Sequence, residues 1–168
     1  MREAIYLALG FASTMFVALG VIPSLPFPLM YTPLVLITGL LVLQREGVGP
    51  GIAWLLLGSL LLSIDHVAPR MLIPSIIATL VAAIFANRVF ATRSVYALMG
   101  LGLITGLTFS LVVLLGALFS VIFLATPLPT TLLLSLLAFF LLLQLGLYLG
   151  FLAVTSLRSW TLRTFVVR

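Results

Sequence analysis

Six long apolar runs divide the chain, and short segments rich in proline, glycine or charge separate them. Proline lacks the amide hydrogen that a helix interior needs, so the proline-rich segment after the first run ends one helix before the next begins. The runs cover Ala4 to Ile22, Phe27 to Leu43, Gly51 to Ile64, Met71 to Ala86, Val95 to Ala125 and Leu128 to Leu157. This pattern predicts an all-α membrane protein, a polytopic bundle of six transmembrane helices forming one integral membrane domain over residues 1–168.

The composition excludes a soluble protein. The 168 residues are 64% apolar and 7% charged, and they include no cysteine, whereas an ordinary soluble domain is about 45 to 50% apolar and about 25% charged. Too few polar side chains remain to coat a globule in water, so we expect a lipid bilayer around the helices. The net charge of +5 comes from arginines at the ends of apolar runs, a pattern that concerns membrane orientation and predicts no nucleic-acid partner.

The arginines are distributed unevenly between the two sides of such a bundle. With six spans, one side carries all of them except Arg70, namely Arg2, Arg45, Arg88, Arg93, Arg158, Arg163 and Arg168. Cytoplasmic loops of membrane proteins carry the excess of positive residues. We therefore predict a multi-pass protein with both termini in the cytoplasm.

The runs differ in length. At 1.5 Å per residue, the third and fourth reach only roughly 21 to 24 Å, while the fifth and sixth reach roughly 45 Å. The hydrocarbon core is about 30 Å thick, so the short pair either crosses a thinned bilayer or forms a re-entrant hairpin. We expect true spans, because a hairpin would hold the ionisable residues between the two runs at membrane depth.

Small residues recur at a spacing of four on the later runs: Gly102 and Gly106 on the fifth, and Gly146 and Gly150 on the sixth. Membrane helices associate where small residues allow their backbones to approach closely. These glycines therefore mark contact faces, either within this chain or toward a partner protein. Several such stripes indicate that some face is left for a partner.

Polar residues within or beside the apolar runs are few, and two groups are candidates for partner contact. Gln144 lies near the centre of the sixth run, where its amide needs a hydrogen-bonding group on another helix, a substrate or a partner. Asp65, His66 and Arg70 form a cluster of ionisable groups at the predicted outer edge of the membrane. Such residues are functional candidates, although a solvated loop in which Asp65 pairs with Arg70 explains them equally.

Catalysis is not expected. The chain has one histidine, three acidic residues and no cysteine, and it lacks a Ser/His/Asp set, paired carboxylates, a phosphate-binding glycine loop and an HExxH motif. We therefore predict no enzyme, no catalytic residues, no metal site and no cofactor.

The stretch from Thr32 to Phe90 resembles the rod shape-determining protein MreD family. The matching elements are Pro33 opening an apolar run, Arg45-Glu46-Gly47 before a glycine-led helix, the segment from Gly51 to Leu62 followed closely by Asp65, and Ala86-Asn87-Arg88 closing the next helix. The resemblance implies a non-enzymatic scaffold of the bacterial inner membrane that serves cell shape and peptidoglycan synthesis in the lateral wall. It also implies an MreC-like partner and wall-synthesis enzymes, with Asp65 as the one polar position carried over.

A second class remains open. The chain is also similar in length and helix number to the substrate-specific component of energy-coupling-factor transporters, which binds a small molecule. Such a protein needs a polar-lined pocket, for which Trp54, Tyr96 and Gln144 are candidates. We favour the scaffold, because the chain is poor in polar pocket residues and its local match to the first family is better.

Overall fold

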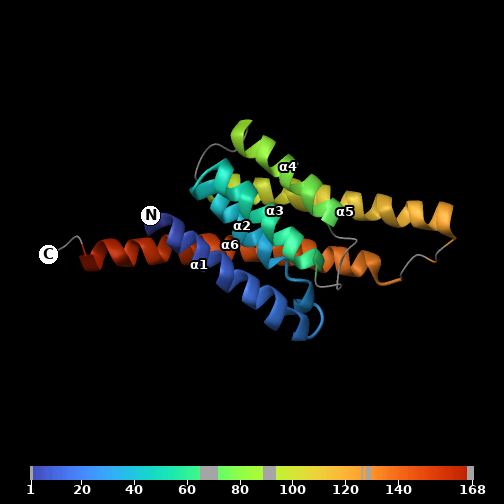
Figure 1. Cartoon of the computed structure of the whole chain (residues 1–168), viewed down its shortest axis with the longest axis horizontal. Helices are drawn as coiled ribbons and strands as arrows, with labels where there is room; N and C mark the ends of the chain where they lie inside the picture. Colours follow the sequence, from blue (N-terminus) through green and yellow to red (C-terminus); the bar gives the residue numbers. More distant parts are fainter. Residues whose placement is uncertain (1, 65–71, 89–93, 126, 128–129, 166–168) are drawn as a thin grey trace.

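The computed structural model describes the chain except residues 1, 65–71, 89–93, 126, 128–129 and 166–168. The described part contains six α-helices, which confirms the all-α prediction (Figure 1). They are α1 (Arg2–Phe16), α2 (Leu34–Arg45), α3 (Val48–Ile64), α4 (Leu72–Arg88), α5 (Val95–Leu124) and α6 (Leu132–Phe165). A π-helix (Val17–Val21) and a 3-10 turn (Ile22–Ser24) continue α1, and a second 3-10 turn (Leu29–Tyr31) precedes α2.

Three of the described helical segments are long and apolar enough to cross a membrane, namely Ala4–Ser24, Val95–Leu124 and Leu132–Ser156. These apolar helices indicate a lipid-bilayer environment. The other three helices are shorter: α2 has 12 residues, and α3 and α4 have 17 each. At 1.5 Å per residue they measure about 18 Å and about 26 Å, less than the ~30 Å of the hydrocarbon core.

The sixth and second helices differ most from their predicted bounds. α6 begins at Leu132, four residues later than expected, and continues to Phe165, eight residues beyond the predicted Leu157. The second helix starts late. It begins at Leu34, so the first seven residues of the predicted run, Phe27 to Pro33, lie outside α2. Pro28 and Pro33 remove two backbone donors from this stretch, and Thr32 is extended, with φ −63° and ψ 115°. A continuous helix cannot form there, and the predicted span is shortened accordingly. Conversely, α3 begins before Gly51, at Val48, because a proline in the first turn of a helix, here Pro50, is tolerated.

The short α2 is the centre of the bundle. It packs against α3 and α6 and also contacts α1, α4 and α5. Its buried leucines and isoleucine form one core cluster with residues of four other helices: Leu36, Ile37, Leu40 and Leu43 with Leu55, Ala78, Ala82, Leu98, Leu101, Phe109, Leu143 and Leu147. Figure 1 shows α5 and α6 running along the long axis of the molecule beside this core.

Glycines let α3 and α6 approach α2 closely. A methyl group placed on Gly39 of α2 would overlap Leu55 of α3, and one placed on Gly146 of α6 would overlap Ile37 of α2. One turn further along α6, a methyl group on Gly150 would lie 2.7 Å from Leu41 Cδ1. Only hydrogen fits at these positions, so larger residues there would push the helices apart.

The first helical segment is attached to the bundle through a small buried cluster, in which Met15 and Ala18 pack with Val35 of α2, and through Trp54 of α3. The ring of Trp54 meets Phe11 edge-to-face, with centroids 5.2 Å apart, and a methyl group on Gly10 would lie 3.3 Å from it. Its Nε1 donates a hydrogen bond of 3.1 Å to Thr38 Oγ1 on α2. One aromatic side chain therefore contacts both α1 and α2.

Replacing Trp54 with phenylalanine is expected to lower the free energy of unfolding by more than the about 1 kcal/mol of the lost hydrogen bond to Thr38, because the smaller ring also no longer reaches Gly10 and leaves space at a buried site. The measurement is a double-mutant cycle with Thr38→Val, read by thermal unfolding in detergent. Coupling between the two substitutions supports the bond. Strict additivity would contradict it.

The start of α1 and the end of α6 lie toward the same end of the molecule (Figure 1). The ends of α2 and α4, which carry Arg45 and Arg88 in their last turns, point toward that end as well. This arrangement agrees with an even number of crossings.

Candidate partner-binding seam and apolar cavity

The seam between α5 and α6 contains two of the glycines singled out in the sequence. A methyl group on Gly102 would overlap Leu147, and one on Gly106 would lie 3.0 Å from Leu143 Cδ2 and 3.1 Å from Phe140 Cδ2. Both glycines and both leucines are buried. The α5 glycines therefore pack against α6, just as Gly146 and Gly150 pack against α2. All four glycines contact side chains of this chain, and a contact with a second protein at these positions stays a prediction.

Gln144 lies on this seam and is not satisfied there. Its Nε2 atom is buried and has no hydrogen-bond partner among the described residues, and a methyl group on Gly102 would lie 3.5 Å from it. The internal hydrogen bond that would make this amide structural glue is therefore not formed by Nε2 in the described part of the chain. An unmet buried donor costs about 1 to 3 kcal/mol.

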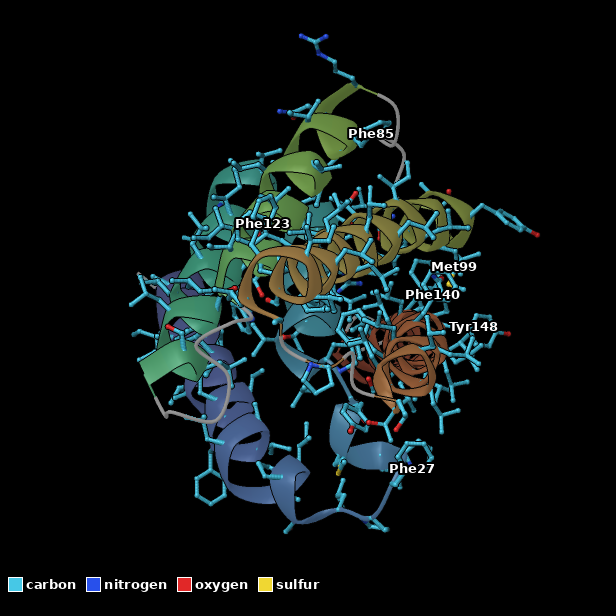
Figure 2. All side chains as sticks on the ribbon, turned by 90° about the vertical axis from the view of Figure 1, so that its right-hand side faces the viewer. Phe27, Phe85, Met99, Phe123, Phe140 and Tyr148 are labelled. Carbon is cyan, nitrogen blue, oxygen red and sulfur yellow. The ribbon has the colours of Figure 1, made fainter. Side chains whose placement is uncertain are left out.

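The residues one turn on either side of Gln144 differ in exposure: Phe140 is half-buried at the edge of the seam, whereas Tyr148 projects outward. Figure 2 shows Phe140 and Tyr148 of α6 on the same side of the molecule as Met99 of α5, and Tyr148 is 46% exposed. Residues four apart lie on one helix face, so Phe140, Gln144 and Tyr148 share a face. We call the surface formed by Met99, Phe140, Gln144 and Tyr148 the Gln144 face. Gln144 as a residue is half-buried, but its Nε2 points into the seam, so a partner helix on this face can satisfy the amide only once the side chain turns outward.

The ionisable cluster predicted at the outer edge, Asp65, His66 and Arg70, lies outside the described residues.

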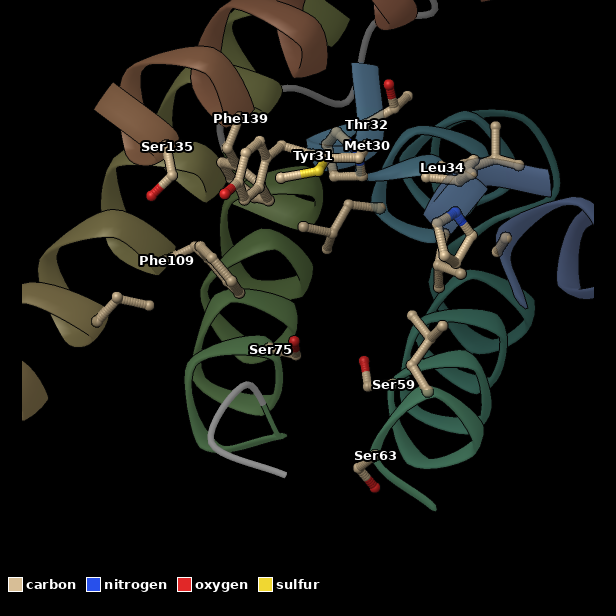
Figure 3. A pocket seen from close by; sticks show the side chains of 18 of the residues that line it. Met30, Tyr31, Thr32, Leu34, Ser59, Ser63, Ser75, Phe109, Ser135 and Phe139 are labelled. Atoms are coloured by element: carbon tan, nitrogen blue, oxygen red, sulfur yellow. The ribbon is translucent and has the colours of Figure 1, made fainter. Parts of the chain in front are cut away.

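A second feature is a cavity of about 470 Å³. Its walls come from the end of the first helical segment, the stretch leading into α2, the C-terminal end of α3, the N-terminal ends of α4 and α6, and the middle of α5. Figure 3 shows Ser59 of α3 and Ser75 of α4 facing each other across it. Phe109 and Phe139 line another wall, stacked with centroids 4.4 Å apart.

The three residues expected to line a pocket do not line this one. Trp54 is buried against α1 and α2, Tyr96 is 86% exposed, and Gln144 lies on the α5–α6 seam. No sequence pattern indicated the cavity, because its hydroxyl residues come from several separate segments of the chain. These residues are Tyr31, Thr32, Ser59, Ser63, Ser75 and Ser135.

Comparisons with protein-family models, with curated proteins and with solved structures each find no match to this chain. The structure therefore defines its class by fold alone: an all-helical protein with apolar helices of membrane-spanning length.

Proposed function

We propose that this protein is a non-enzymatic scaffold of the bacterial inner membrane, with six membrane helices and cytoplasmic termini, which binds a partner helix on its Gln144 face. The resemblance to the MreD family suggests an MreC-like protein as that partner and cell-shape control through wall synthesis as the process. The observation that carries the proposal is the buried Nε2 of Gln144, which has no hydrogen-bond partner among the described residues. A partner helix that offers an acceptor at this depth satisfies the amide.

Replacing Gln144 with leucine separates a partner contact from a structural role. Leucine keeps the approximate volume and removes the unmet donor, so we expect equal or higher thermal stability of the isolated protein. An interhelical hydrogen bond is worth about 0.6 to 2 kcal/mol, so affinity for the MreC-like partner should fall about three- to thirtyfold. The measurements are thermal unfolding in detergent and recovery of the co-expressed partner.

The matched control is Leu145→Ala, at the neighbouring residue, which is 54% exposed. We expect it to leave partner recovery unchanged. Asp65→Ala is a second test variant in the same experiment, since the resemblance implies a partner contact at that position. Unchanged recovery with Gln144→Leu, or a loss of stability without a loss of partner, would count against the proposal.

A second candidate is a small-molecule-binding subunit similar to the substrate-specific component of energy-coupling-factor transporters. The cavity favours it, since about 470 Å³ falls within the roughly 300 to 1,000 Å³ of small-molecule sites. Purified protein that retains a small organic ligand near one-to-one, with no protein partner in mild detergent, would support this candidate over the scaffold. Gene neighbours also separate the two: an actin-like shape gene and an MreC gene support the scaffold, whereas an ATPase and a coupling subunit support the transporter.

A further inference from the structure

The described walls of the cavity carry no charge. None of the residues found to line it is Asp, Glu, Arg, Lys or His, and most are aliphatic or aromatic. A charged group inside such a site would lose its hydration without gaining a counter-ion. Any charged part of an occupant therefore lies outside the cavity.

The cavity hydroxyls also have little to offer a polar occupant. Ser59 donates to Leu55 O at 2.6 Å, Ser63 to Leu60 O at 2.7 Å, and Ser135 to Leu132 O at 2.8 Å. The protons of these three hydroxyls are thus committed to carbonyls of their own helices, which leaves Ser75 and Tyr31 as the hydroxyls able to donate into a space that is otherwise mostly apolar. A buried water needs two to four polar partners, and cavities with apolar walls stay dry. Most of this volume suits hydrocarbon better than water.

The position of the cavity beside the outer surface of α5 and α6 indicates which hydrocarbon can reach it. Two of its walls belong to α5 and α6, whose apolar lengths suit a bilayer. Val113 on α5 and Leu136 on α6 contribute to the lining, while Leu111 and Leu137, near them on the same helices, are 57% and 55% exposed. Cavity walls and outer helix surface are therefore close together on the two helices that lipid chains would surround.

We propose that the cavity binds one acyl chain of a bilayer phospholipid, with the headgroup outside the described walls. The inference depends on the cavity alone and on neither function proposed above. The shared chemistry is a long hydrocarbon chain, which a free fatty acid could also supply. The experiment therefore includes both sources.

The test uses the full-length protein in phosphatidylcholine nanodiscs that contain a small fraction of phosphatidylcholine with a diazirine near the end of one acyl chain. After illumination, labelled peptides are quantified by mass spectrometry. Because Leu57 and Ile73 on the same helices are 56% and 66% exposed, the labelled residue within each peptide is located by fragmentation. We expect labelling at Ser59 and Ser75 themselves, in addition to the α5 surface around Leu115, which is 56% exposed and reports ordinary lipid contact. A parallel sample contains a diazirine fatty acid instead.

Two variants fill the cavity from opposite walls: Ser59→Phe on α3 and Ser75→Leu on α4. Each is expected to lower labelling of the facing cavity wall at least tenfold and to leave the α5 reference unchanged. Leu57→Phe, at a residue of α3 that is 56% exposed, is the matched control and should change neither. If one of these variants fails to fold, the other still tests the proposal.

Cavity labelling that both filling variants leave unchanged, or labelling confined to the α5 reference, would overturn the proposal. Labelling by the fatty-acid probe without labelling by the phospholipid probe would overturn it too, because the chain would then be unesterified. None of these results bears on partner recovery with Gln144→Leu, so failure here is distinguishable from failure of the scaffold.

Discussion

Replacing Gly102 with leucine is expected to lower the free energy of unfolding by about 3 kcal/mol or more, at the upper end of the cost of overpacking. Even a methyl group at this position would overlap Leu147. Leu147 has no room to move, because it is 0% exposed and belongs to the core cluster around α2. The substitution therefore forces α5 and α6 apart at the seam that also holds Gln144.

Gly116→Leu is the matched control on the same helix, since a methyl group placed on Gly116 has nothing within 4 Å. Gly116→Leu should leave the free energy of unfolding unchanged or raise it slightly, because glycine costs about 1 kcal/mol in a helix interior relative to better helix formers. Gly106→Leu and Leu107→Ala form a second pair: Gly106 is buried, whereas Leu107 is 54% exposed. Thermal unfolding in detergent measures all four. Equal midpoints within each pair would contradict close packing between α5 and α6.

The helices could be predicted from hydropathy and chain breakers because both act locally. The fifth run was expected to end at Ala125, and α5 ends at Leu124, where Ala125 adopts φ 50° and stops the helix. Gly47, with φ +101°, separates α2 from α3 in the same way. The start of α2 was wrong by seven residues, because the residues before Leu34 are apolar enough for a span while their prolines prevent a continuous helix. Apolarity alone does not determine backbone hydrogen bonding.

For the candidate sites, the sequence predicted positions but not the residues that those positions contact. Spacing identified Gly102 and Gly146 as contact positions, and both are in contact, but the partners Leu147 and Ile37 follow from the tertiary arrangement. No local sequence pattern predicted the cavity, since Ser59, Ser75 and Ser135 line one space only after three helices have packed. Gln144 was identifiable as a buried amide by its position. That its Nε2 lacks a hydrogen bond could only come from the structure.

Labelling of single cysteines with an impermeant thiol reagent is expected to be all-or-none across the two ends of the molecule. The chain has no cysteine of its own, so each introduced residue reports alone. We expect Ser24→Cys to react in intact cells and Ser156→Cys to react only after permeabilisation, since positive residues concentrate on the cytoplasmic side. Both serines are exposed. Reaction at Ser156→Cys but not at Ser24→Cys in intact cells would reverse the proposed orientation.

A third cysteine, His66→Cys, distinguishes two membrane arrangements for α3 and α4. Each helix has 17 residues and so measures about 26 Å, a few ångströms less than the ~30 Å hydrocarbon core. A modest thinning of the bilayer accommodates that difference, whereas a re-entrant hairpin would leave the connecting residues at membrane depth, where ionisable groups are costly. We therefore expect His66→Cys to react in intact cells as readily as Ser24→Cys. If it stays unreactive in intact and permeabilised cells while Ser24→Cys reacts, the two helices form a hairpin and the protein crosses the bilayer fewer than six times.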